Sequence, residues 1–281
     1  MSRWIWNGLR TGIRTTRFPA PGVAGEEQAG STVELRWQSL TAPHALAAAE
    51  LCPTDAITAT GTAVEGEMRF DAGACIMCGR CSRELPETFV QVLDPRVAVR
   101  HRNDLSCAVK WQAGGGPQPA ALKDEAERVR AQAIRLFRHS LHIRHVDAGS
   151  CNGCESELQM LSQPYLDLHR LGIFFTPTPR HADVLLVTGV VTANMESPLL
   201  ETYAAMPAPK LVIAAGACAI SGGSFAHGPT TRGPLDRLLP VDCYVPGCPP
   251  TPQALLHGLL VAMGRAAARS SGAPPEAGHG S

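Results

Sequence analysis

The sequence predicts an α/β domain around a parallel sheet in its C-terminal part, preceded by a small α+β domain. Between Leu141 and Arg269, continuous apolar runs alternate with stretches of helical periodicity, which is typical of βα units. A Gly/Pro-rich stretch at 113–120 marks a boundary. The chain has 281 residues, 44% of them hydrophobic, and is near the length at which one core divides into two.

These observations suggest a division of the chain into five segments. We expect an amphipathic arm at 1–30, a cysteine-containing domain at 31–112, a linker and helix at 113–140, an α/β domain at 141–268 and a disordered tail at 269–281.

The N-terminal arm combines arginines, without acids, and large apolar side chains. The arginines are Arg3, Arg10, Arg14 and Arg17, and the apolar residues are Trp4, Ile5, Trp6, Leu9 and Ile13. This composition suits a helix lying in a membrane interface. An arm that docks on a partner subunit is an equal and compatible interpretation.

In the segment at 31–112 we expect a helix over the Ala-rich residues 41–51, ended by the Cys52–Pro53 pair. A short strand at 68–71 precedes the sequence CIMCGRC. The amphipathic pattern of residues 121–141 predicts a further helix.

Four apolar runs predict the strands of the C-terminal domain: LHIRHV, ADVLLVTG, KLVIAAG and VDCYVPG. Helical patterns follow the first, second and fourth runs, and a loop follows the third. The expected fold is therefore a flavodoxin-like three-layer α/β sandwich.

Charge, hydropathy and cysteine content exclude several function classes. The formal net charge is zero and aromatic residues make up 5% of the chain, which argues against nucleic-acid binding. No run reaches the roughly 18 apolar residues of a membrane span, and the first 20 residues lack the apolar core of a signal peptide. In a protein that is not exported, clustered cysteines bind metal more often than they form disulfides.

The first cysteine set follows the spacing of a bacterial ferredoxin run, C-x2-C-x2-C-x3-C-P. Cys75, Cys78 and Cys81 occupy its first three positions, but Leu85 stands where the fourth cysteine is expected, before Pro86. An earlier run ends at Cys52–Pro53, and its first three positions are all alanine: Ala42, Ala45 and Ala48.

This pattern removes the ligands of one cluster as a complete set. In two-cluster ferredoxins the fourth cysteine of each run binds the other cluster. One cluster would need positions 42, 45, 48 and 85, which are apolar here and can pack as ordinary core. The other keeps Cys52, Cys75, Cys78 and Cys81, so we predict one cluster in this domain. Zinc is the rival metal for four cysteines, although the third x2-spaced cysteine favours iron–sulfur. Cys107 reads as a free thiol.

The second cysteine set lies beyond the predicted strand ends. Cys151 and Cys154 follow the first run, Cys218 the third and Cys248 the fourth. Ligands of open α/β sheets gather at the carboxyl ends of the strands, so three loops can converge on one metal centre. Cys243 lies inside a predicted strand and is expected to be a buried small hydrophobe.

Several motifs give the α/β half a strong resemblance to a known family. HVDAGSCNGCESELQML, PRHADVLLVTGVVT, GACAISGG and VPGCPPTPQALLHGL resemble the small (20 kDa) electron-transfer subunit shared by respiratory complex I and membrane-bound [NiFe] hydrogenases, over roughly residues 141–265. Complex I subunits carry adjacent cysteines where this chain has the separated pair Cys151 and Cys154. The separated pair is similar to the hydrogenase subunits of the formate hydrogenlyase type.

The resemblance implies a [4Fe–4S] cluster held by Cys151, Cys154, Cys218 and Cys248, next to a large subunit. Glu157 matches an acidic position of the family, which implies a role beside the cluster or in a proton path. A solvated or salt-bridged helix residue is the equal alternative for Glu157. GLRTGIRTTRFP, near the N-terminus, resembles the opening of the ferredoxin-like subunit of the same complexes, over about residues 1–95. The chain thus resembles a fusion of two neighbouring subunits with two [4Fe–4S] clusters in total.

The function that these expectations imply is electron relay within an oxidoreductase complex, without a complete active site in this chain. The implied partners are a hydrogenase or complex I-like large subunit, other electron-transfer subunits and membrane subunits, and the implied location is the cytoplasmic face of the inner membrane. Two alternatives remain: a subunit of a complex I-like NADH/quinone oxidoreductase, and a non-redox assembly module that holds zinc.

Overall fold

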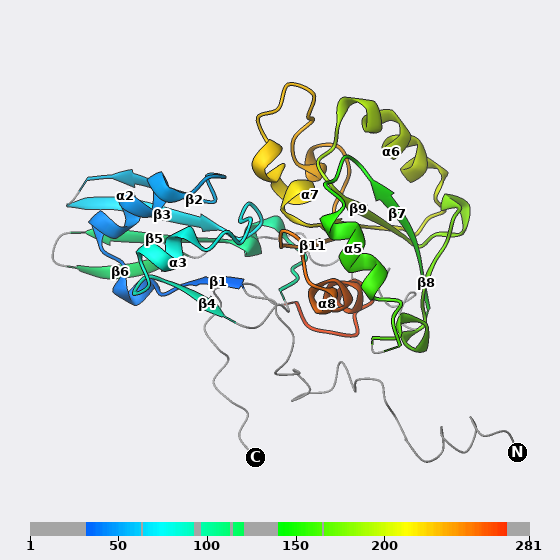
Figure 1. Cartoon of the computed structure of the whole chain (residues 1–281), viewed down its shortest axis with the longest axis horizontal. Coiled ribbons are helices and arrows are strands. Elements are labelled where there is room, and N and C mark those ends of the chain that lie inside the picture. Colours follow the sequence, from blue (N-terminus) through cyan, green and yellow to red (C-terminus); the bar gives the residue numbers. More distant parts are fainter. Residues whose placement is uncertain are drawn as a thin grey trace, which may run out of the picture.

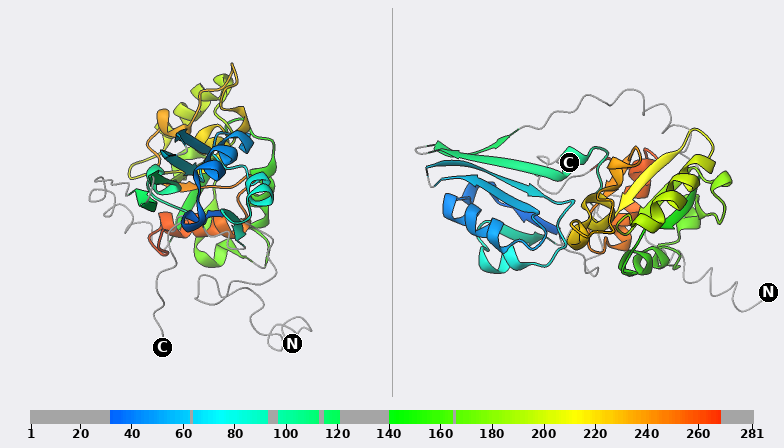
Figure 2. Two further views of the ribbon diagram at one scale, coloured as in Figure 1. Left: turned by 90° about the vertical axis from the view of Figure 1, so that its left-hand side faces the viewer. Right: turned by 90° about the horizontal axis from the view of Figure 1, so that it is seen from above.

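The computed structural model describes residues 32–62, 64–92, 97–112, 115–120, 140–164 and 166–268. These residues form two bodies that lie side by side, each built on its own main sheet (Figures 1 and 2). The expected arm at 1–30, the helix at 121–139 and the tail at 269–281 lie outside the described residues.

A five-stranded parallel sheet forms the centre of the C-terminal body. Its strands are β7 (Leu141–Asp147), β8 (Ile173–Phe175), β9 (Val184–Thr188), β10 (Leu211–Ala215) and β11 (Cys243–Val245). Their order across the sheet is β11-β10-β9-β7-β8. All neighbouring pairs are parallel. Counted from β8, this is the order 2-1-3-4-5 of flavodoxin-like sheets, with the switch point between β7 and β9. The four predicted strands are confirmed.

Helices cover both faces of this sheet, as the three-layer prediction requires. They are α5 (Gly153–Met160), α6 (Ala193–Ala205), α7 (Ala217–Ser221) and α8 (Pro252–Ala262). Alternate strand residues enter two separate cores: Leu185 and Val187 of β9 face one, and Leu186 faces the other. The first core includes residues of α6 and α7, and the second includes residues of α5 and α8. Burial on both faces explains why the strands are continuous apolar runs.

The N-terminal body contains two antiparallel strand pairs and two helices. Its elements are β1 (Thr32–Leu35), α2 (Ala42–Leu51), β2 (Ile57–Gly61), β3 (Glu65–Asp71), α3 (Arg80–Glu84) and β4 (Phe89–Val92). β1 pairs with β4, and β2 pairs with β3. The predicted helix at 41–51 and strand at 68–71 are confirmed, and Cys52 caps the end of α2.

The predicted Gly/Pro linker needs a correction, because residues 115–120 form a strand. β6 (Gly115–Ala120) pairs with β5 (Ser106–Gln112), and together they extend the β2-β3 hairpin into a four-stranded sheet. Prolines are tolerated in edge strands, where a missing N–H costs no ladder hydrogen bond, and β6 is such an edge. The N-terminal body therefore extends to Ala120 instead of ending at residue 112.

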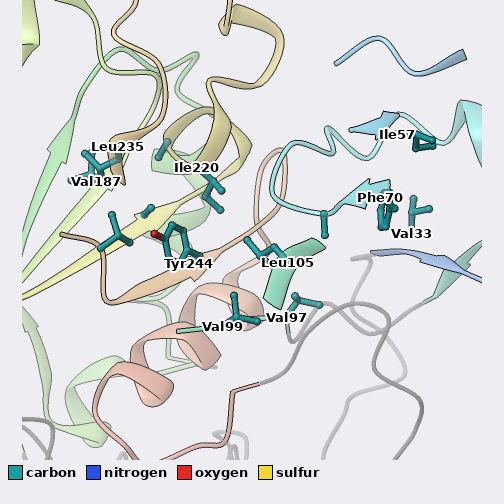
Figure 3. Close-up of a cluster of buried hydrophobic side chains, with 14 of the residues drawn as sticks. Val33, Ile57, Phe70, Val97, Val99, Leu105, Val187, Ile220, Leu235 and Tyr244 are labelled. Carbon is teal, nitrogen blue, oxygen red and sulfur yellow. The ribbon is translucent and has the colours of Figure 1, made fainter. Parts of the chain in front are cut away.

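The two bodies share one continuous buried core, shown in Figure 3. Val33 and Phe70 of the N-terminal body belong to the same cluster as Ile220 and Tyr244 of the C-terminal body. A backbone bridge joins them as well, because Val99 and Tyr244 exchange N–H···O bonds of 3.0 and 2.8 Å. This bridge covers the exposed edge of β11.

Candidate metal centres

The four cysteines of the first set line one cavity. Cys52 follows α2, Cys75 and Cys78 lie in the loop after β3, and Cys81 is in α3. The same cavity is lined by apolar side chains from three strands, namely Val33, Ile57 and Phe70. The structure thus brings the remote Cys52 to the three closely spaced cysteines, as the sequence predicts.

Two left-handed residues shape the loop that carries Cys75 and Cys78. Met77 has φ 55° and Gly79 has φ 69°, so the backbone turns sharply on either side of Cys78. The Met77 N–H donates to the Cys75 sulfur at 3.4 Å. Backbone donors to sulfur stabilise the thiolate form and tune a metal–sulfur centre.

Burial makes the first site unfavourable for free thiolates. Burial, with smaller contributions from the other three cysteines, raises the pKa of Cys75 to about 12. Burial also raises the pKa of Cys81, again with contributions from Cys78 and Cys52. All four cysteines line the same cavity. Four thiolates there need a cationic group to compensate their charge.

The residues at the positions without cysteine pack as core, as predicted. Ala45 and Ala48 are completely buried, and Ala42 is nearly so. Leu85 is partly buried against the same cluster. Apolar side chains therefore occupy the positions at which the ligands of a second cluster would stand.

The second set lies at the carboxyl edge of the parallel sheet. Cys151 follows β7 and Cys154 lies in the first turn of α5. Cys218 lies in α7 directly after β10, and Cys248 follows β11. Parallel strands bring these three loops to one edge, although Cys151 and Cys248 are far apart in the sequence. The fold therefore places these cysteines at the sheet edge where the sequence predicts them, and their joint binding of one metal centre stays a prediction.

Glycine permits the closest approach within this site. Gly216 has φ 89°, and a Cβ atom there would stand 2.8 Å from the Cys154 sulfur. A Cβ atom at Gly223 would stand 3.2 Å from the Cys218 sulfur. A side chain at Gly216 would thus collide with a candidate ligand, and its backbone conformation is one that other residues rarely adopt.

The electrostatics of the second site repeat those of the first. Burial raises the pKa of Cys154, with contributions from Glu155 and then from Cys218, Cys248 and Cys151. Burial, with contributions from Cys248 and Cys151, raises the pKa of Cys218 to about 11. Burial and Cys151 raise the pKa of Cys248. A compact group that carries positive charge and binds four thiolates fits this donor set.

Within the described ranges, no three His, Cys, Asp or Glu side chains are arranged as the ligands of a single metal ion. The first set is therefore defined by the cavity that its four cysteines line, and the second by its position at the sheet edge and by the glycines packed against Cys154 and Cys218.

A polar network that the sequence did not reveal supports the second site. Glu155, next to Cys154, accepts hydrogen bonds from the hydroxyls of Thr188 and, at 2.7 Å, Ser150. Thr188 is fully buried at the end of β9. The Nε2 atom of His145 lies 2.8 Å from the Thr188 hydroxyl. The network thus ties the loop that carries Cys151 and Cys154 to the neighbouring strand, a contact that no sequence spacing could signal.

The remaining predicted residues take varied positions. Glu157 is half-buried on α5, and burial raises the pKa of its carboxyl group; its role beside the cluster stays a prediction. Cys243 is completely buried in β11, as predicted, with its sulfur 3.6 Å from the Gly258 carbonyl oxygen. Cys107 is partly buried in β5 opposite Phe70, and burial raises the pKa of its thiol to about 11.

Fold and site together define a class of protein: a doubly wound α/β domain with four convergent cysteines at the carboxyl edge of its sheet. The chain belongs to the family described as NADH ubiquinone oxidoreductase, 20 Kd subunit, whose profile matches residues 151–262. The match begins at Cys151 and includes all four cysteines of the second set. It lies entirely within the C-terminal body.

The relatives of the chain are subunits of oxidoreductase complexes. Formate hydrogenlyase subunit 7 of Escherichia coli is 43% identical over 152 residues, which cover 54% of this chain and 60% of the relative. The probable membrane-bound hydrogenase subunit mbhJ of Pyrococcus furiosus is 45% identical over 149 residues, covering 53% of this chain and 89% of the relative. A chain in the structure of the membrane-bound sulfane sulfur reductase, an archaeal respiratory membrane complex, is 35% identical, with a TM-score of 0.42. That alignment covers 49% of this chain and 75% of the other.

Among the described helices, none has the length and hydropathy that crossing a membrane requires.

Proposed function

We propose that this chain is an iron–sulfur electron-transfer subunit of a membrane-associated hydrogenase or formate hydrogenlyase-like complex. The observation that carries the proposal is the second cysteine set, in which segments that follow three strands bring Cys151, Cys154, Cys218 and Cys248 to one edge of the parallel sheet. Membership of the 20 kDa subunit family supports it, as do the names of the formate hydrogenlyase and membrane-bound hydrogenase relatives. A [4Fe–4S] cluster, when bound, supplies reversible one-electron chemistry.

The residues of the chain have defined tasks in this proposal. Cys151, Cys154, Cys218 and Cys248 hold the second cluster as thiolates. Gly216 keeps the space beside Cys154 open. The Glu155–Thr188 contact holds the ligand loop against the sheet.

We propose further that residues 32–92 form a one-cluster, ferredoxin-like unit held by Cys52, Cys75, Cys78 and Cys81. Its two antiparallel pairs, β1 with β4 and β2 with β3, arrange the chain as two successive strand–helix–strand halves. Cys52 lies at the end of the helix in the first half, and the other three cysteines lie at the start of the helix in the second. That placement is the one that the ferredoxin spacing implies for a single remaining cluster.

The proposed partners follow from the same relatives. A large subunit would lie beside the second cluster, where Cys151 and Cys248 are exposed. Other electron-transfer subunits would exchange electrons with the first cluster, and membrane subunits would anchor the complex. We propose that the chain is a peripheral subunit on the cytoplasmic face of the inner membrane; the name of the membrane-bound hydrogenase relative supports the membrane association.

A complex I-like NADH/quinone oxidoreductase is the second candidate, favoured by the name of the matching family. Identification of the large subunit that copurifies with this chain would distinguish the two candidates: cysteine pairs that bind nickel would support a hydrogenase, and their absence would support a quinone reductase.

Metal analysis of the anaerobically purified chain tests the core of the proposal. About eight irons per chain, with matching sulfide, are expected for two [4Fe–4S] clusters. Zinc without sulfide would instead support the third candidate, a non-redox assembly module.

A further inference from the structure

The two cysteine-bearing loops touch each other across the boundary between the two bodies. Gly73 precedes Cys75 by two residues, and Ile220 follows Cys218 by two residues. A Cβ atom at Gly73 would stand only 2.7 Å from Cγ2 of Ile220, and Ile220 is 1% exposed. Because two residues span at most roughly 7 Å, this buried contact lies close to both candidate centres.

Arg102 packs against the same contact from the other side. A Cβ atom at Gly73 would also stand 3.0 Å from Cζ of Arg102. The Arg102 guanidinium forms a two-pronged ion pair with Asp71, with Nη1 to Oδ1 at 2.8 Å. Asp71 in turn accepts a hydrogen bond from the Gly73 N–H at 2.9 Å. Arg102 therefore fixes the loop that leads to Cys75.

The same arginine also faces the C-terminal body. Asp236 and Tyr244 lie within electrostatic reach of its guanidinium, and the Tyr244 hydroxyl donates to Asp236. The segment just before Arg102 is held by the Val99–Tyr244 bridge, and the Arg100 guanidinium donates to the Val261 carbonyl at the end of α8. Figure 3 shows Leu105, Ile220 and Tyr244 packed together at this boundary.

We propose that Gly73 and Arg102 are positioning residues that set the separation of the two iron–sulfur centres, through the Gly73–Ile220 contact. The proposal rests on the proposed function, since it requires a cluster in each cysteine set. Gly73 admits Ile220 because it has no side chain, and Arg102 braces the contact by pairing with Asp71. The path between the ligand loops is then short and closed to water.

Two variants of the full chain test this proposal: Gly73→Leu, which wedges the loops apart, and Arg102→Gln, which removes the brace. Arg232→Gln is the matched control, because it breaks the 2.6 Å ion pair with Glu196 inside the C-terminal body only. The spin–spin interaction between the two reduced clusters is measured by electron paramagnetic resonance. Hydrogen exchange of the Tyr244 amide gives a measure of docking that does not depend on the clusters.

We expect both variants to keep the iron and sulfide content of the unmodified chain, to lose spin–spin interaction and to exchange the Tyr244 amide faster, while the control stays unchanged. An unchanged interaction in both variants overturns the proposal. Loss of a cluster from both variants also overturns the proposal, because Gly73 and Arg102 would then be needed for cluster binding and not for the separation of the two clusters. If the unmodified chain holds fewer than two clusters, the proposed two-cluster function is itself refuted. That result differs from the two variant outcomes above because it is seen without any substitution.

Discussion

The two cysteine sets present the same donor atoms but depend on different levels of the fold. In the N-terminal set, three cysteines lie between residues 75 and 81, in the loop after β3 and the first turn of α3, and only Cys52 comes from elsewhere. In the C-terminal set, the ligands come from three loops that follow three strands of one sheet. The first site is built mostly from residues that are close in sequence, and it needs one tertiary contact, which brings Cys52 to the other three cysteines. The second exists only when the parallel sheet is complete.

The support around each site differs in the same way. Apolar side chains from β1, β2 and β3 line the first cavity. The second site has a glycine cradle at Gly216 and a hydrogen-bonded carboxylate at Glu155. Left-handed backbone shapes both sites, at Gly79 in the first and at Gly216 in the second, whereas apolar packing surrounds the first and a hydrogen-bonded carboxylate supports the second. The following predictions use this difference.

Replacement of a C-terminal ligand should have the largest effect. Cys218→Ser should remove the second cluster and lower the iron content from about eight to about four per chain, because a [4Fe–4S] cluster needs its four thiolates. The first cluster should remain, since its ligands lie in the other body. Iron analysis with electron paramagnetic resonance measures this. Cys243→Ser is the control, and loss of iron there as well would show that Cys218 acts through folding.

The reciprocal change tests the remote ligand of the first site. Cys52→Ser should remove or alter the first cluster and leave the signal of the second unchanged, because Cys52 completes the set with Cys75, Cys78 and Cys81. Visible absorption and paramagnetic resonance spectra check this result. A spectrum identical to that of the unmodified chain would show that the fourth ligand is another residue.

Gly216 tests how far the second site depends on a backbone without a side chain. Gly216→Ala should cost about 1–3 kcal/mol of unfolding free energy from backbone strain. It should also weaken cluster loading, because the new Cβ atom meets the Cys154 sulfur. Gly233→Ala is a matched control, with φ 80° but an arginine side chain as its nearest neighbour. Equal cluster loading in both variants would show that strain alone matters.

The packing at the vacated positions can be tested by adding volume. Ala45→Leu should destabilise the N-terminal body by about 1–3 kcal/mol, because Ala45 is completely buried. Chemical denaturation of the full chain measures the change. Ala47→Leu, at a partly buried position of the same helix, is the control. A neutral effect of Ala45→Leu would indicate that a space has remained open there.

The smallest effect is expected from the polar network. Glu155→Gln keeps the size of the side chain and removes its charge, so the reduction potential of the second cluster should rise by on the order of tens of millivolts. Glu157→Gln removes the charge of the other acid on the same helix. Comparing the two variants separates the effect of Glu155, which accepts hydrogen bonds from Thr188 and Ser150, from the effect of a charge elsewhere on α5. Potentiometric titration measures both. A larger shift for Glu157 would favour the role that the family resemblance implies for it.

Much of the fold was predictable because its signals are local. The runs that became β9 and β10 are apolar on both faces, and the Cys52–Pro53 pair ended α2 as predicted. β8 was not predicted, because three residues are too few for a periodic pattern. β6 was taken for a linker, because Gly and Pro signal a break along the chain while an edge strand tolerates both.

The amino-acid sequence by itself determined which cysteines are candidates for each set, which positions of the ferredoxin spacing lack cysteine and how the βα units alternate. These features depend on residue type and spacing, which a sequence carries directly. Only the tertiary structure decided how Glu155 reaches Thr188, how β6 joins the N-terminal sheet and how Gly73 meets Ile220. Those contacts join residues far apart in the chain, and they exist only where packing brings strand ends and loops together.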